Sequence, residues 1–339
     1  MKSRVVFTAA LAAVLATPAQ AHVKWFCAYD VAGQPEGLAN VLCDDFISLT
    51  ALAMAFFLWA CLLERSVLGP MAMAALDRST TWLRRNDEVI IRGILGYFFV
   101  SLWNIGGILM TPELKTDLAW VPWMQLAMAA CLLWRATLPL VSLGICVLFG
   151  MSVQAYGTFH LLDYPIFLGV AAYLALTGLG LRPFGARPLD VVRWATSVTL
   201  MWASVEKWAY PSWSFPLFEA NPDALMGFDE MFFMRAAGVV EFILAFSLVW
   251  TPLIRRGAAI MLCFIFVSAI VGFGKVDAIG HSPIIAVLLA FAADDARAVP
   301  GRALVRRVWL APPAFAASLA VFLGGYYVVH TAIYGTGIL

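Results

Sequence analysis

Charged residues are scarce in this sequence of 339 residues. Asp, Glu, Lys and Arg make up only 13% of the chain, whereas 63% of it is hydrophobic. An average soluble protein is about half apolar and roughly a quarter charged. The charges of this chain are too few to cover a water-soluble globule, so the composition predicts an integral membrane protein that contacts the lipid bilayer.

A surplus of basic residues is also missing, because 22 Lys and Arg residues are balanced by 21 Asp and Glu residues. Neutralising nucleic-acid phosphates requires such a surplus, so nucleic acid is excluded as a partner. The sequence has no glycine-rich phosphate loop, zinc motif or CxxC pair. It therefore contains no recognisable electron carrier, and a complete oxidoreductase would need a redox partner subunit.

The N-terminus has the features of an export signal. Lys2 and Arg4 precede an apolar stretch that is shorter than the ~20 residues needed to span a bilayer. The small residues Ala19 and Ala21 then provide a cleavage site. We predict a signal peptide over residues 1–21 and a periplasmic segment over 22–45; the alternative is an uncleaved anchor helix.

Two of the six cysteines, Cys27 and Cys43, lie on this exported segment. Disulfides form in oxidising compartments, so we expect these two residues to be bonded to each other. The other four cysteines lie in apolar stretches and are interpreted as small packing residues.

Ten apolar windows are long enough, or nearly long enough, to cross a membrane. They lie at about 46–63, 89–110, 119–135, 137–156, 164–181, 191–209, 231–251, 257–274, 281–293 and 309–330.

Most arginines lie in or beside every second connection between these windows, and an excess of basic residues is typical of cytoplasmic loops. The fifteen arginines on that side are Arg65, Arg78, Arg84, Arg85, Arg92, Arg135, Arg182, Arg187, Arg193, Arg255, Arg256, Arg297, Arg302, Arg306 and Arg307. The pattern predicts an all-α protein with about ten transmembrane helices in a bacterial inner membrane. Both mature termini would then be periplasmic, and an amphipathic helix would follow the first span within residues 46–88.

The sequence also contains an internal repeat, because residues 90–181 align in order with residues 191–293. The matches are Arg92 with Arg193, Gln125 with Arg235, Cys146 with Cys263, Gly157 with Gly274, and Tyr164-Pro165-Ile166 with Ser282-Pro283-Ile284. We predict two parallel four-helix units, at 89–181 and 182–295, with a further helix in 296–339. The alternative is that the two apolar regions align through composition alone.

Charged side chains inside the spans gather in the second unit, at Glu206, Lys207, Arg235 and Glu241. A charge at the centre of a membrane helix costs at least ~2.5 kcal/mol, so such residues need partners and often mark function. Arg235, Gly238 and Glu241 follow one another in steps of three, so we expect them on one side of their helix. We predict that these four residues form a catalytic site; the alternative is that they only hold helices together as ion pairs.

Four further residues near the outer ends of these spans are candidates for binding a cofactor: His281, Lys275, Asp277 and Trp208. An aromatic ring can stack on a quinone, although an interfacial belt also explains most of the outer aromatic residues. The first unit has Asp163 where the second has His281.

Histidines raise a second possibility, because His22, His160 and His281 all belong to the predicted outer face. After cleavage His22 would carry the free terminal amine, and an amine beside an imidazole can chelate copper. The alternative is that these histidines are ordinary hydrogen-bonded residues at helix ends.

The stretch 191–295 resembles the DoxX superfamily of small four-helix membrane proteins. The resemblance is carried by Val205-Glu206-Lys207, by Arg235-x-x-Gly238-x-x-Glu241, by the turn at 251–257, and by His281-Ser282-Pro283. The first unit resembles a diverged copy of the second. The glycine that often precedes the lysine in this family is absent here.

The superfamily includes subunits of thiosulfate:quinone oxidoreductase, so the resemblance implies a membrane component of a quinone-linked or sulfur-related redox system. Arg235 would bind an anionic oxygen, Glu241 would move a proton, and Lys207 and His281 would tune both. The alternatives are a periplasm-facing protein that binds or transports a metal such as copper, or a small solute, and a scaffold for other subunits.

Overall fold

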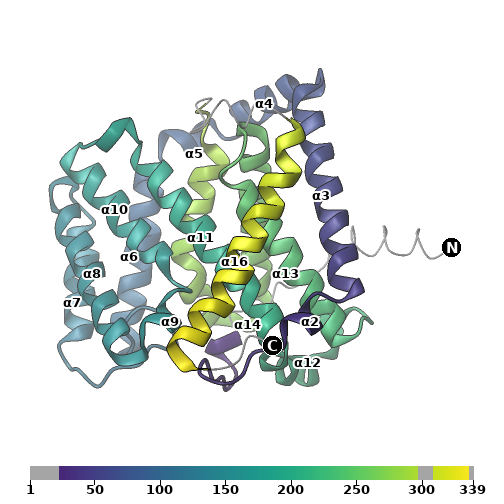
Figure 1. Cartoon of the computed structure of the whole chain (residues 1–339). Helices are drawn as coiled ribbons and strands as arrows, with labels where there is room; N and C mark the ends of the chain where they lie inside the picture. Colours follow the sequence, from purple (N-terminus) through teal and green to yellow (C-terminus); the bar gives the residue numbers. More distant parts are fainter. Residues whose placement is uncertain (1–22, 297–307, 336–339) are drawn as a thin grey trace.

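The computed structural model describes residues 23–296 and 308–335, and these residues form a helical protein without β-strands (Figure 1). The α-helices are α2 (Leu38–Val41), α3 (Asp44–Arg65), α4 (Leu68–Ser79), α5 (Thr81–Arg85), α6 (Asp87–Ile105), α7 (Val121–Cys131), α8 (Leu138–Tyr156), α9 (Thr158–Leu161), α10 (Pro165–Leu179), α11 (Pro188–Ala209), α12 (Phe215–Ala220), α13 (Glu230–Ser247), α14 (Pro252–Ala293) and α16 (Ala311–Tyr334). The predicted all-α class is confirmed for this part of the chain. The predicted signal peptide at 1–21 lies outside the described residues.

The long helices run side by side between two ends of the molecule (Figure 1). The short helices α4 and α5 lie at one end, and α2, α9 and α12 lie at the other. Helix α10 packs against α11, and α6 packs against α14, while α3 and α16 contact each other and α13. We call the end with α4 and α5 the arginine end and the opposite end the cavity end.

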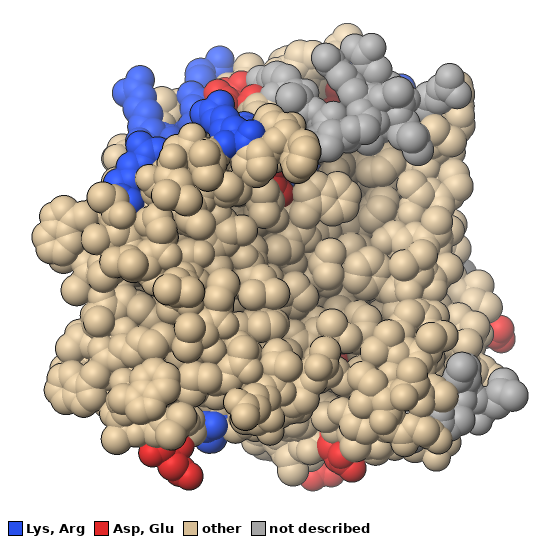
Figure 2. All heavy atoms as spheres, turned by 60° about the vertical axis from the view of Figure 1, so that its left-hand side comes forward, with Lys and Arg blue, Asp and Glu red and all other residues tan. Residues whose placement is uncertain are grey.

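In the described part of the chain, five helical stretches are long and apolar enough to cross a membrane: 44–65, 87–105, 135–156, 252–293 and 308–334. Large hydrophobic side chains such as Trp59, Leu143 and Val271 are exposed on them. In Figure 2 a broad belt with almost no charged atoms lies between one end, where most of the visible Lys and Arg gather, and the other end, where most visible charges are acidic. Soluble monomers rarely expose so much contiguous apolar surface, so these features indicate a membrane protein.

Ten predicted windows become five such helices for three physical reasons. Helices α7 and α10 are apolar but have only 11 and 15 residues. Helices α11 and α13 carry several charged side chains. Helix α14 covers the windows at 257–274 and 281–293, and it is broken at Gly274 (φ 74°, ψ −147°).

The break at Gly274 has a counterpart in the first unit. Gly157, which the repeat aligns with Gly274, ends α8 with φ 85° and ψ 157°. A positive φ is easy for glycine and strained for residues with a Cβ atom, so both positions use the same property. The two glycines that the predicted repeat aligns therefore share a local backbone feature.

Buried arginines hold the arginine end together. Asp294, directly after α14, accepts hydrogen bonds from Arg187 (2.8 Å) and Arg193, and Arg255 lies 3.4 Å from the same carboxylate. Arg256 has no exposed side-chain surface and bonds to Asp77 on α4 at 2.5 Å. These pairs fasten α4, α11 and α14 to one another.

Candidate functional site

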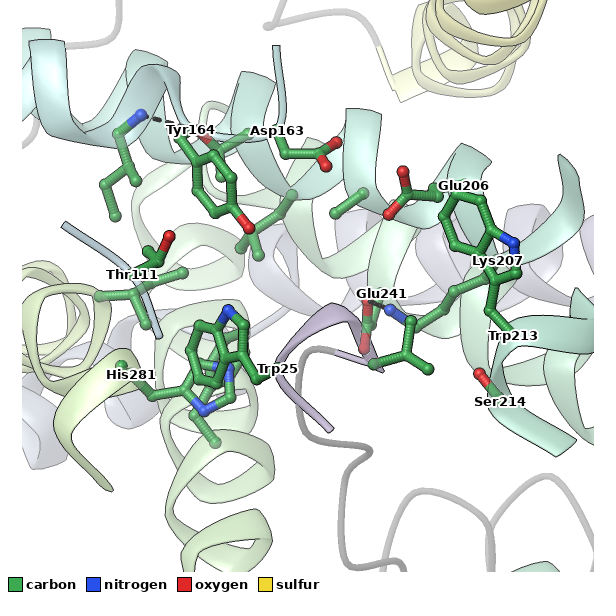
Figure 3. A pocket seen from close by; sticks show the side chains of 18 of the residues that line it. Trp25, Thr111, Asp163, Tyr164, Glu206, Lys207, Trp213, Ser214, Glu241 and His281 are labelled. Carbon is green, nitrogen blue, oxygen red and sulfur yellow. Dashed lines mark hydrogen bonds and ion pairs between the residues drawn. The ribbon is translucent and has the colours of Figure 1, made fainter. Parts of the chain in front are cut away.

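A cavity of about 90 Å³ lies at the cavity end and is lined by residues from both predicted units. The first unit contributes Asp163 and Tyr164, the second contributes Glu206 and Glu241, and the N-terminal segment contributes Trp25 (Figure 3). One water needs roughly 10–15 Å³ of such volume, so the cavity has room for a small molecule. It is the best candidate for a functional site among the described residues.

Lys24 lies in η1 (Val23–Trp25), at the start of the described N-terminal segment, and connects the two predicted units. Its ammonium group lies 2.6 Å from the Glu206 carboxylate on α11 and also bonds to Asp163, and its side chain has no exposed surface. Burial alone would lower the pKa of Lys24, but Asp163 and Glu206 outweigh burial and raise that pKa above its ordinary value. Lys24 therefore stays charged inside the protein.

A second ion pair joins the last turn of α11 to α13. The Lys207 Nζ atom lies 2.9 Å from the Glu241 carboxylate, and both residues line the cavity. The helices approach closely at Gly238, where an added Cβ would lie 2.2 Å from the Trp208 indole nitrogen. Trp208 donates to the Arg235 carbonyl oxygen at 3.2 Å, which fixes the two helices near the pair.

Trp25 covers His281 on the other wall. Their ring centroids are 4.6 Å apart, and Phe266 approaches His281 from another side at 4.7 Å. The neighbouring Gly280 makes room, because a Cβ there would lie 2.2 Å from the Trp25 ring. The His281 Nδ1 atom lies 3.0 Å from the carboxylate of the fully buried Asp277.

The first unit contributes a further buried acid beside the cavity. Glu113, in the loop after α6, accepts a hydrogen bond from the Tyr164 hydroxyl and lies 3.7 Å from the His160 Nε2 atom. His160 is 2% exposed. Glu113, His160, Asp163 and Tyr164 of the predicted first unit therefore lie at or beside the same cavity as Glu206 and Glu241 of the predicted second unit.

The N-terminal segment is fixed over the cavity end by the C-terminal helix. The Tyr327 hydroxyl of α16 donates to the Glu36 carbonyl oxygen at 2.6 Å, and the Tyr210 hydroxyl donates to that of Gly33 at 2.7 Å. The Glu36 N–H in turn donates to the Ala209 carbonyl oxygen at 2.8 Å. We call residues 23–41 the lid, since they close one side of the cavity.

The structure brings four of the predicted site residues to this cavity: Glu206, Lys207, Glu241 and His281. The other predicted residues lie elsewhere. Arg235 pairs with Asp45 at 3.3 Å and lines a smaller neighbouring hollow. Trp208 is packed between helices, Asp277 lies behind His281, and Lys275 is exposed.

The predicted metal ligands are not gathered into a site within the described chain. His160 pairs with Glu113, whereas His281 pairs with Asp277. Among the residues that the structure describes, no group of three or more His, Cys, Asp or Glu side chains is placed to hold a metal ion. His22 lies outside these residues.

The predicted disulfide between Cys27 and Cys43 is not formed in the structure, where both are free thiols. Cys43 is the N-cap residue of α3. The Cys27 thiol instead lies at the backbone of Leu217 in α12; burial raises its pKa, and a hydrogen bond from Leu217 opposes that rise. The lid packs near α12, so the Cys27 thiol lies beside Leu217 and not beside Cys43. Hydropathy could not predict this contact.

Two residues of this site were not predicted from the sequence: Thr111, which lines the cavity, and Lys24, which pairs with Asp163 and Glu206. Trp25, Tyr164 and Trp213 also line the cavity, but they belong to the outer aromatic residues that were interpreted mainly as an interfacial belt. They lie on the lid or on loops and helix ends, where periodicity gives no position in space. One signal was available for Lys24, because it is the first basic residue after the predicted signal peptide.

Comparison of the chain with models of protein families, with curated proteins and with solved structures finds no match. The resemblance to the DoxX superfamily therefore depends on the sequence motifs alone. Three of those motif residues, Glu206, Lys207 and Glu241, line the cavity together with His281.

Proposed function

We propose that this chain is a DoxX-like protein of the bacterial inner membrane, with its arginine end in the cytoplasm and its cavity end facing the periplasm. The five apolar helices and the uncharged belt of Figure 2 support a position in the bilayer. Arginines at the end with α4 and α5 support the orientation, because positive charge favours cytoplasmic loops.

Within this membrane protein, the cavity binds a quinone headgroup and exchanges protons with it, as part of a redox system with an electron-carrying partner subunit. One observation carries the proposal: the cavity combines aromatic walls with an ion pair of a carboxylate and an ammonium group. Trp25, Trp213 and Phe266 provide the flat surfaces, and Glu241 with Lys207 provides the pair.

Glu241 is the proton-exchanging group in this proposal. Reduction of a quinone takes up two electrons and two protons, so its site needs a group that gives and accepts protons. Lys207 holds the Glu241 carboxylate at 2.9 Å and has further N–H donors for a carbonyl oxygen of the ligand. Arg235 lines a different hollow, so Lys207 takes the cationic role that was predicted for Arg235.

The test is quinone binding by the full chain purified in mild detergent. Endogenous quinone is extracted, and a short-chain ubiquinone is titrated against the intrinsic tryptophan fluorescence. We expect saturable binding in the wild type and at least a tenfold weaker affinity in Glu241→Gln. Asp45→Asn is the matched control, because Asp45 is a carboxylate outside the cavity, and it should bind within twofold of the wild type.

Absence of both extracted quinone and saturable binding would contradict the proposal. Equal weakening in Glu241→Gln and Asp45→Asn would also contradict it, because the effect would then not belong to the cavity. Metal analysis of the same sample separates the alternative: stoichiometric copper without quinone would favour a metal-binding protein.

A further inference from the structure

The position of the Lys24 ammonium group has the properties of a binding site. Carboxylates approach it from both units, at Asp163 and Glu206. Two aromatic rings complete the enclosure, since the Nζ atom lies 5.6 Å from the ring centroid of Tyr29 and 5.5 Å from that of Trp213. Contacts of this kind attract a cation to the face of a ring.

The charges around the cavity also favour a cation. Its carboxylates are Asp163, Glu206 and Glu241, whereas Lys24 and Lys207 supply the ammonium groups. One carboxylate is therefore in excess when all five are ionised. The Asp163 side chain is 1% exposed, and its Oδ1 atom is buried without a hydrogen-bond partner. Figure 3 shows the Asp163 and Glu206 carboxylates directed toward one another.

We propose that Asp163, Glu206, Tyr29 and Trp213 form a binding site for a primary ammonium group, and that Lys24 is its intramolecular ligand. The ligand class is a small primary alkylammonium ion, which takes the site when Lys24 is absent or withdrawn. The inference uses the same cavity as the proposed function, but it does not depend on quinone binding.

The geometry selects a primary ammonium group over other cations. The distance of 2.6 Å from Nζ to Glu206 is that of a charge-assisted hydrogen bond, which needs an N–H donor. A quaternary ammonium ion has no N–H group. An alkali cation lacks the alkyl chain that in Lys24 runs from the lid to the site.

Occupation of this site also sets the position of the lid. Trp25 follows Lys24 directly, and its ring lies against Gly280 and His281. When Lys24 leaves the carboxylates, Trp25 is no longer held against this wall of the cavity. The ammonium site and access to His281 are therefore linked through two consecutive residues.

Chemical rescue of Lys24→Ala in the full chain tests the proposal. The variant removes three methylene groups and the ammonium group and leaves space, and n-butylammonium supplies a primary ammonium group on an alkyl chain of similar length. We expect Lys24→Ala to melt at a lower temperature than the wild type, and n-butylammonium to restore its melting temperature saturably. Tetramethylammonium and potassium at the same ionic strength should not restore it.

Two further variants serve as controls. Lys24→Met fills the space with a side chain of similar length and should not respond to n-butylammonium. The double variant Lys24→Ala with Glu206→Gln lacks one carboxylate and should lose at least tenfold in the apparent affinity for n-butylammonium.

Lack of saturable rescue in folded Lys24→Ala would overturn the proposal, as would equal rescue of Lys24→Met. If Lys24→Ala does not purify in folded form, the extraction is repeated in n-butylammonium. Recovery of folded protein then supports the site, and failure to recover it counts against the site. If the wild type binds quinone but Lys24→Ala is not rescued by n-butylammonium, only the ammonium site is rejected. If Lys24→Ala is rescued but the wild type binds no quinone, only the quinone proposal is rejected.

Discussion

The two ends of this molecule both bury charged side chains, yet they use them differently. At the arginine end the Asp294 carboxylate is surrounded by Arg187, Arg193 and Arg255. At the cavity end the ammonium groups of Lys24 and Lys207 meet carboxylates beside a cavity of about 90 Å³. A buried ion pair by itself indicates only packing, whereas an ion pair that borders a cavity indicates a site.

The chemistry of the two cations fits this contrast. The planar guanidinium group of arginine has five donors and bridges several acceptors at once, as Arg187 does between Asp190 and Asp294. The ammonium group of lysine is compact and leaves space around it. Arginine therefore suits the closed end, and lysine suits an end where a ligand must enter.

The largest effect is expected for Asp294→Asn, which leaves three arginines without their shared carboxylate. Removing one partner of a buried pair costs about 3–5 kcal/mol, so we expect a loss of this size in the free energy of unfolding. Denaturant unfolding in detergent measures it, with quinone binding as a second readout that should persist in the folded fraction.

Glu206→Gln is the matched variant at the cavity end. Lys24 keeps Asp163 as a partner, so we expect a smaller loss of about 1.5–3 kcal/mol. Equal losses in Asp294→Asn and Glu206→Gln would break the contrast between the two ends.

Acid should weaken the arginine end. Burial alone would raise the pKa of Asp294, but hydrogen bonds from Arg187 and the charges of Arg193 and Arg255 lower that pKa well below its ordinary value. The lowered pKa contributes stability that is fully present above about pH 4 and is lost as the pH falls further. Melting temperatures between pH 7 and pH 3 should fall less steeply in Asp294→Asn than in the wild type.

Two glycines, Gly280 and Gly238, each face an indole ring, so the comparison is between Gly280→Ala and Gly238→Ala. An added Cβ would lie 2.2 Å from Trp25 at Gly280 and 2.2 Å from Trp208 at Gly238. Overpacking costs about 1–3 kcal/mol in each case. Only Gly280→Ala should also change ligand affinity, because only Trp25 lines the cavity.

Gly257→Ala is the control for this pair, since an added Cβ meets nothing within 4 Å. It should leave ligand affinity unchanged and should not destabilise the protein. Unchanged ligand affinity in Gly280→Ala would show that Trp25 does not shape the site.

The smallest effect is expected for Arg235→Ala. Its pair with Asp45 spans 3.3 Å at a partly exposed position, and such pairs contribute about 0–1 kcal/mol. Quinone affinity should stay within twofold of the wild type. A loss of tenfold or more in quinone affinity would show that Arg235 belongs to the binding site and would contradict the role given to Lys207.

Hydropathy and charge predicted much of this fold. Each of the ten apolar windows contains a helix, and α4 and α5 occupy the region predicted to hold an amphipathic helix. Periodicity did not show that two windows share one helix broken at Gly274, because a positive φ at a single glycine leaves no trace in an apolar sequence.

Four of the eight residues predicted as catalytic or cofactor-binding line the cavity, and the reason lies in what residue spacing can encode. Glu206, Lys207 and Glu241 follow from helix geometry, since a charge inside a span must face a partner. Helix geometry alone also favoured Arg235, because it could not reveal Asp45 as a competing partner. Lys24 and Trp25 belong to a lid without periodicity, and their places depend on contacts far along the chain.

The contact of the lid with α16 has a consequence for biosynthesis. Residues 31 and 36 are separated by 299 and 291 residues from their partners His330 and Tyr327 on α16. Because synthesis proceeds from the N-terminus, the lid cannot take its final position until α16 has been made and inserted. The lid thus closes the cavity only after α16 is in place, and a chain that stops short of α16 would leave its buried acids open to water.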